Sequence, residues 1–217
     1  EEADGAGKGD IDGGTPNGPG SIPFQAVTED QLKNLQQVTQ ELRLASDTDA
    51  DVDWQVGAFY FDSSFGVTSI DGTFGATTVY HSNESWALFG QSTYNLTEQW
   101  DVTAGVRYTK DEKHFKAGAQ NVNPPVWAVN RGLIKLQQYV PLSVDDGQVS
   151  WELASNYRLT ELMSVYGRLA RGFRAPSIQA RDVAFEGMPS IATSETIDSI
   201  EFGGKAELLE RTLRLNG

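Results

Sequence analysis

The sequence predicts an all-β fold, namely a segment of an antiparallel, up-and-down transmembrane β-barrel with short periplasmic turns and long extracellular loops. Three observations support this. Apolar and polar residues alternate with a period of two over long stretches, the connections alternate between short and long, and Trp and Tyr recur near the ends of the alternating stretches. No apolar run reaches the ~18 residues of a transmembrane helix, so none is expected.

The alternation is clearest in residues 100–109, where Trp100, Val102, Val106 and Tyr108 share one face and polar residues share the other. The same pattern occurs at residues 38–46, 51–62, 84–96, 149–159, 162–172, 194–208 and 211–217, which predicts about eight strands. Several are about twice as long as the ~5–6 residues of a typical soluble strand. They match the ~9–11 residues with which a tilted strand crosses a bilayer.

The connections are sorted by length. Short turns are expected near residues 47–51, 96–99, 159–161 and 208–210, and long loops near residues 63–83, 113–147 and 173–193. An up-and-down barrel produces this alternation because its tight turns lie at the periplasmic rim and its long loops lie outside. Residues 1–37 open with a Gly- and Asp-rich stretch and are expected to form an extracellular loop, which leaves residues 38–217 for the barrel strands.

The aromatic residues fall in pairs along individual strands. Trp54 and Tyr60 are six residues apart, as are Trp151 and Tyr157, whereas Trp86 and Tyr94 are eight apart, as are Trp100 and Tyr108. Eight residues at ~3.3 Å, tilted by ~45°, span roughly 19 Å of the bilayer normal, near the ~25 Å apolar band of an outer-membrane barrel. We therefore predict that these eight residues lie at the two membrane interfaces. The alternative is a soluble β protein that packs them in its core.

The composition excludes several functions. There are 30 acidic residues against 17 Lys and Arg, a net charge of -13, which argues against a nucleic-acid partner. Cysteine is absent, which excludes thiolate metal sites, disulfides and Cys nucleophiles. His81 and His114 are the only histidines, no GxSxG motif is present, and no carboxylate pair stands out. We predict no enzyme activity, no cofactor and no metal ion.

Four segments resemble the barrels of TonB-dependent receptors: QELRLAS at residues 40–46, ALFGQSTYNLTEQWDVTAGVRYTKDEK at 87–113, YGRLARGFRAPSI at 166–178 and EFGGKAELLERTLRLNG at 201–217. The resemblance implies that residues 1–217 are part of a barrel domain that has 22 strands in the family and closes around an N-terminal plug. It also implies that the plug and the TonB box lie outside this sequence.

Charged residues on the polar strand faces are expected to point into the lumen, because each would cost ~2–4 kcal/mol at the middle of the bilayer. The predicted lumen-facing wall comprises Arg107, Glu152, Arg158, Arg168, Glu201 and Lys205. One interpretation is that these residues form salt bridges along the wall that hold the plug. The other is that Arg107 and Arg168 contact the plug or guide an anionic substrate.

Substrate contacts are expected in the long loops, since loops carry function on rigid scaffolds. In the 113–147 loop the candidates are His114, Phe115, Trp127 and Tyr139. Arg171 and Arg174 are further candidates, although Pro176 also fits a strand that simply leaves the sheet.

The resemblance implies a receptor in the bacterial outer membrane that takes up a scarce nutrient, such as a ferric siderophore, cobalamin or an oligosaccharide. Its expected partners are outer-membrane lipid, its own plug, TonB with the inner-membrane energising complex, and the small-molecule nutrient. The alternatives are a passive porin-like barrel, a soluble β-sandwich carbohydrate-binding module and an outer-membrane enzyme.

Overall fold

A computed structural model describes residues 2–10, 27–47, 52–71, 75–121, 130–132, 141–179, 189–209 and 212–217. These residues form an almost entirely β structure. The strands are β1 (Glu2–Asp10), β2 (Val27–Ala45), β3 (Val52–Asp71), β4 (Gly75–Thr97), β5 (Trp100–Asn121), β6 (Leu142–Thr160), β7 (Met163–Arg174), β8 (Ser177–Gln179), β9 (Ser190–Ala192), β10 (Glu195–Leu208) and β11 (Leu213–Asn216). Among the described residues, no helix is long and apolar enough to cross a membrane.

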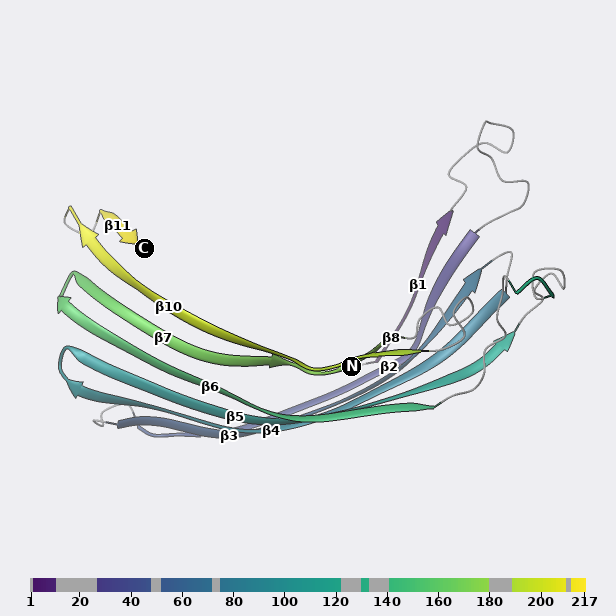
Figure 1. The fold of residues 1–217 in the computed structure, drawn as a ribbon, viewed down its shortest axis with the longest axis horizontal. Helices are drawn as coiled ribbons and strands as arrows, with labels where there is room; N and C mark the ends of the chain where they lie inside the picture. The colour runs from purple at the N-terminus through teal and green to yellow at the C-terminus, as the bar shows by residue number, and fades with distance from the viewer. Residues whose placement is uncertain are drawn as a thin grey trace, which may run out of the picture.

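Nine of the strands form one curved sheet in the order β1-β2-β3-β4-β5-β6-β7-β10-β11, and all neighbours are antiparallel. Figure 1 shows this sheet as a trough, with the tight connections between strands at its left end. The strands follow one another in space as they do in sequence, with only the small β8-β9 hairpin between β7 and β10. This sequential order confirms the predicted up-and-down topology, and a sandwich with Greek-key connections is excluded.

The strands are longer than predicted at their loop-side ends. Residues 63–71 and 75–83 continue β3 and β4 instead of forming a long loop, and residues 113–121 continue β5. Residues 142–147 likewise belong to β6, and the 173–193 region contains β8 and β9. The predicted loop over residues 1–37 is also wrong for 2–10 and 27–37, which lie in β1 and β2. At residues 110–113 both faces of β5 are charged, and beyond them apolar residues such as Phe115 and Ala117 lie on the opposite face. Because the apolar face changes along the strand, a search for one continuous apolar face did not reveal the extensions.

Alternate residues of each strand point to the two faces of the trough. On β5, the even-numbered face carries exposed apolar residues such as Val106, which is 55% exposed, whereas Phe115 on the odd-numbered face is 1% exposed. Ile178 of β8 packs against the buried cluster that contains Phe115, and β8 lies inside the trough in Figure 1. The odd-numbered face of β5 is therefore concave, and the even-numbered face is convex.

The only cluster of fully buried apolar side chains among the described residues lies on the concave face near the loop side. Val79, Phe115 and Ala117 form its centre, and Val67, Leu142 and Ile178 pack around them. The β8-β9 hairpin is thus held against the inner wall of the trough.

Candidate functional site

The eight aromatic residues predicted at the membrane interfaces are all exposed on the convex face and form two rows. The upper row, nearer the loops, consists of Tyr60, Trp86, Tyr108 and Trp151, and the lower row, nearer the turns, consists of Trp54, Tyr94, Trp100 and Tyr157. Tyr60 pairs directly with Trp86 across β3 and β4, and Trp100 pairs with Tyr157 across β5 and β6. The ring of Trp86 also contacts the ring of Tyr108, with 5.5 Å between centroids.

Both rows slope across the sheet in the same direction. The strand register shows which residue of β4 lies level with each aromatic residue. Taken from β3 to β6, the members of the upper row lie level with residues 86, 86, 88 and 90 of β4, and those of the lower row with residues 92, 94, 97 and 97. With ~3.3 Å per residue and ~4.8 Å between strands, this shift over three strand spacings corresponds to a tilt of about 40–50°. A plane that follows both rows therefore meets the strands near the ~35–45° tilt of outer-membrane barrels.

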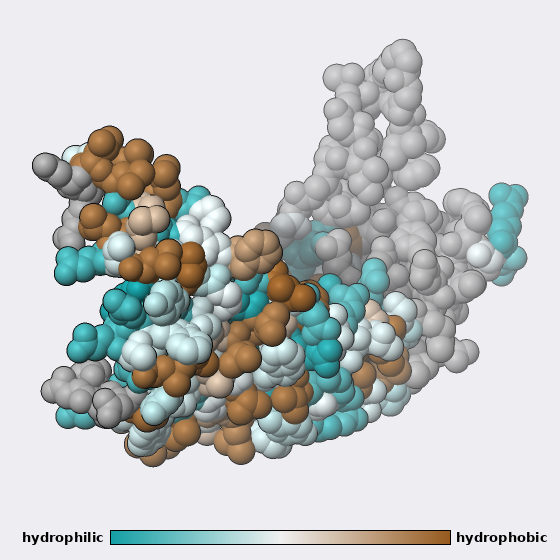
Figure 2. Space-filling view, turned by 60° about the vertical axis from the view of Figure 1, so that its left-hand side comes forward, coloured by the Kyte–Doolittle hydropathy of each residue, from teal (hydrophilic) through white to brown (hydrophobic). Residues whose placement is uncertain are grey.

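The convex band between the rows on β3 to β6 carries no charged residue. It consists of Val56, Ala58, Leu88, Gly90, Ser92, Val102, Ala104, Val106, Leu153 and Ser155. Charges begin just beyond the upper row, with Asp62, Glu84 and Lys110 each two residues past an aromatic member. Figure 2 shows apolar brown residues gathered over the end of the sheet that carries the tight turns. The convex surface therefore has the polarity expected of a barrel wall in a bilayer, with an uncharged band at the level of the hydrocarbon and aromatic rows at the interfaces.

The six predicted lumen-wall residues all lie on the concave face by register. Arg168 donates to Glu152 through Nε at 2.7 Å and Nη2 at 2.5 Å. Nearer the turns, Glu201 accepts a hydrogen bond from Tyr166 at 3.1 Å, and the Lys205 ammonium lies 5.5 Å from the Tyr166 ring centroid. Arg158 and Lys205 border a hollow of ≈ 730 Å³ at this end. The wall thus combines paired charges with polar hollows. That these residues serve transport stays a prediction.

A single concave row crosses five strands at the level of the upper aromatic row. Register aligns Arg43, Gly57, Phe89, Arg107 and Ser150, from β2 through β6. A Cβ on Gly57 would lie 2.4 Å from Cζ of Phe89 and 2.7 Å from the backbone oxygen of Leu42, so only glycine allows the ring to lie there.

The structure separates the two substrate candidates that are adjacent in sequence. His114 lies on the convex face, where its Nε2 is 3.1 Å from Glu112, whereas Phe115 is buried on the concave face. The partners of Phe115 are His81, at 5.2 Å between ring centroids, and beyond it Phe65, whose ring stacks on His81 at 5.1 Å. Sequence reasoning placed His81 in a loop and did not single out Phe65. The signal was the strand parity, which continues unbroken past residue 113.

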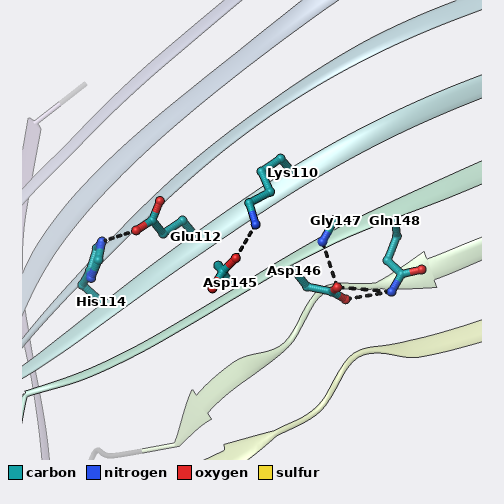
Figure 3. Close-up of polar contacts among 7 residues, drawn as sticks. All are labelled: Lys110, Glu112, His114, Asp145, Asp146, Gly147 and Gln148. Atoms are coloured by element: carbon teal, nitrogen blue, oxygen red, sulfur yellow. Dashed lines mark hydrogen bonds and ion pairs between the residues drawn. The ribbon is translucent and has the colours of Figure 1, made fainter.

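Polar contacts cover the loop-side part of β5 and β6, as Figure 3 shows. Lys110 pairs with Asp145 on the convex face. On the concave face Asp146 accepts hydrogen bonds from Gln148 at 3.0 Å and from the backbone N–H of Gly147 at 2.8 Å. Hydrogen bonds from Ser194 and Gln148 hold the pKa of Asp146 below its ordinary value, while burial lowers the pKa of His81. Within the described ranges, no group of three or more His, Asp or Glu residues is placed to hold a metal ion.

The remaining substrate candidates do not join these residues. Arg171 lies on the convex face, where its Nε and Nη2 bind Asp198 at 2.6 and 2.8 Å. It continues the belt of charges that begins beyond the upper aromatic row. Arg174 is exposed at the end of β7, opposite Glu195. Trp127 and Tyr139 fall outside the described residues. Ligand contact by any of these residues stays a prediction.

Comparison with known proteins decides the family. The family described as TonB dependent receptor-like, beta-barrel matches residues 5–217, almost the whole chain. The chain belongs to this family. The resemblance predicted from its strand segments is thereby confirmed, as is the assignment to a fragment of a large receptor barrel.

Relatives and solved structures similar to this TonB-dependent receptor barrel are described as pesticin receptors or as receptors for siderophores. The pesticin receptors of Yersinia enterocolitica and Yersinia pestis are 25% identical over 202 residues, covering 89% of this chain. The chain spans 28% of the length of these relatives. The solved ferric yersiniabactin uptake receptor FyuA from Yersinia pestis has a TM-score of 0.70 at 24% identity, over 84% of this chain and 27% of that one. The siderophore receptor PiuA from Acinetobacter baumannii gives a TM-score of 0.55 at 13% identity, over 88% and 31%.

Proposed function

We propose that this chain is part of the barrel of an outer-membrane receptor that takes up a ferric siderophore with energy supplied through TonB. Membership in the TonB-dependent receptor family over residues 5–217 is the observation that carries the proposal. The names of two similar solved receptors, for ferric yersiniabactin and for a siderophore, favour iron chelates over cobalamin or oligosaccharides as cargo. In this proposal the protein is a transporter and not an enzyme.

The convex surface supports the location in the outer membrane. Two parallel aromatic rows bound a band without charges, and the tilt they define is that of a barrel wall. The concave wall is polar and charged, which suits a lumen that holds a hydrated plug. TonB and the inner-membrane energising complex act on that plug in the family, so they are the proposed partners of the full-length receptor.

Uptake of ⁵⁵Fe-labelled ferric siderophores tests the proposal. The complete gene is expressed in an iron-starved Gram-negative host that lacks its own siderophore receptors, with and without a functional tonB gene. We expect uptake of at least one ferric siderophore only when TonB is present. Equal uptake in both hosts would indicate the passive porin-like alternative, and uptake in neither across a chemically diverse panel would refute iron transport.

A further inference from the structure

The side chain of Arg107 is held between two aromatic rings on the concave wall. Its guanidinium carbon lies 5.4 Å from the ring centroid of Phe59 and 5.5 Å from that of Phe89. Such contacts stabilise a cation while shielding its faces from water. The position of Phe89 is fixed in turn by Gly57, which leaves room for the ring. The two rings therefore hold the guanidinium in a defined position on the wall.

The hydrogen-bonding edge of Arg107 is only partly used. Its Nε donates to Thr109 Oγ1 at 3.1 Å. Within the described ranges no carboxylate pairs with Arg107, and its two terminal amino groups have no acceptor. The guanidinium thus presents an open edge whose two donors match the two oxygens of a carboxylate.

The neighbouring arginines on the wall differ in this respect. Arg43 occupies the same row and also lies over Phe89, at 5.9 Å from its centroid, but it pairs with Glu41. Arg168 lies on β7, two strands away from Arg107, and is bound by Glu152. Two of these three arginines are therefore bound to a carboxylate, and Arg107 is the one of the three that is not.

A hollow of ≈ 360 Å³ opens beside Arg107. Its lining includes Arg107, the side-chain amides of Gln55 and Gln91, and the charge pair of Glu152 and Arg168. Arg107, Arg168 and Glu152 together leave one uncompensated positive charge there. A carboxylate-bearing group fits both the space and the charge.

We propose that Arg107 is the centre of a carboxylate-binding site on the lumen wall. The carboxylate comes either from an Asp or Glu of the receptor's own plug or from an anionic ferric chelate on its way through the lumen. This inference rests on the proposed function, because both sources exist only in a plugged uptake receptor. In either case the two carboxylate oxygens accept hydrogen bonds from the two terminal amino groups of Arg107, which is a bidentate contact.

The test uses the full-length receptor with Arg107→Gln, which removes the charge, and Arg107→Lys, which keeps the charge but loses the fork. Arg43→Gln is the matched control, since it removes a cation from the same row that already has its own carboxylate. Hydrogen exchange, followed by mass spectrometry, measures plug protection in the purified protein. Binding of ferric citrate, which carries free carboxylates, is measured by tryptophan fluorescence.

If the plug supplies the carboxylate, Arg107→Gln lowers protection in one plug segment about ten- to hundredfold, with a smaller loss in Arg107→Lys, and leaves β4 and β5 protected. If the chelate supplies it, plug exchange is unchanged and the affinity for ferric citrate falls by a similar factor. The inference is overturned if neither quantity changes, or if Arg43→Gln has the same effect as Arg107→Gln. TonB-dependent uptake by the unaltered receptor is unaffected by that outcome, so the proposed function and this inference fail separately.

Discussion

Along the long strands, the apolar residues change from the convex face to the concave face at the upper aromatic row. Between the aromatic rows, β4 and β5 expose apolar residues such as Leu88 and Val106 on the convex face and keep polar residues on the concave face. Beyond the upper row the same strands carry charges on the convex face and bury Val79 and Phe115 on the concave face. The register between β4 and β5 is unbroken from Val79 to Asn95, so the backbone does not cause the switch. In the proposed outer-membrane location the surrounding medium accounts for the switch, because lipid favours apolar residues on the outer face and water favours them on the inner face.

Removing the centre of the loop-side core should have the largest effect. Phe115→Ala deletes a fully buried ring, so we expect the loop-side half to lose about 3–5 kcal/mol while the membrane-level half keeps its stability. Hydrogen exchange of the full-length receptor in lipid, resolved by peptide, measures this difference. Tyr80→Ala, which removes a ring 49% exposed on the convex face, is the control with little expected change. Uniform destabilisation of both halves by Phe115→Ala would mean that they are one cooperative unit.

Placing the same charge in the two halves tests the change of medium directly. Ala104→Arg puts a cation in the charge-free convex band midway between Trp100 and Tyr108 and should cost about 2–4 kcal/mol, the figure for the bilayer midplane. Ser82→Arg puts it on the convex face beyond the upper row, where we expect a change of less than about 0.5 kcal/mol. Unfolding in urea after insertion into lipid vesicles measures both. If both substitutions lowered the free energy of unfolding equally, the upper aromatic row would not mark a membrane boundary.

The membrane-level concave wall is polar, yet we expect it to be tightly packed at one point. Gly57→Val forces the Phe89 ring and the β2 backbone away, so it should destabilise the barrel by about 1–3 kcal/mol. Gly105→Ala is the control on the same face, because its new methyl group would meet Gln91 at an ordinary 3.6 Å. The same urea titration in vesicles compares them. If Gly57→Val left the stability unchanged, the concave wall would not be tightly packed at this point.

The smallest effect is a pH dependence confined to the loop-side half. Burial lowers the pKa of His81, so the folded state binds its proton less readily than the unfolded state, whose histidine has a pKa of ~6.5. The neutral side chain therefore contributes stability above about pH 6.5, and this contribution is lost as the pH falls below that value. Hydrogen exchange at pH 7.5 and 5.5 should show faster opening of the loop-side half at the lower pH. His81→Phe should abolish the difference and His114→Phe should keep it.

The inversion also explains which parts of the structure were predictable from the sequence. Period-2 alternation with apolar residues on one face revealed the membrane-level strands, their order and all eight row residues. At residues 110–113 the sequence Lys-Asp-Glu-Lys is charged on both faces, which resembles the start of a loop although β5 continues through it. Strand parity alone would have placed Phe115 on the concave face, but it could not show which residues of β3 and β4 contact the Phe115 ring. Their association depends on the register of three strands, and no single stretch of sequence contains that information.

The slope of the aromatic rows also bears on the width of the lumen. A strand tilted by about 45° takes up roughly 6.8 Å of the wall's circumference, against the ~4.8 Å spacing of strands measured across them. Tilt alone thus widens the enclosed channel by about 40% for a given number of strands. In the family's 22-strand barrel the circumference would be about 150 Å and the diameter about 48 Å. A channel of that diameter needs an occupant to keep the outer membrane sealed. The slope of the aromatic rows on four strands thus contributes to this need, because the same 22 strands without tilt would enclose a narrower channel.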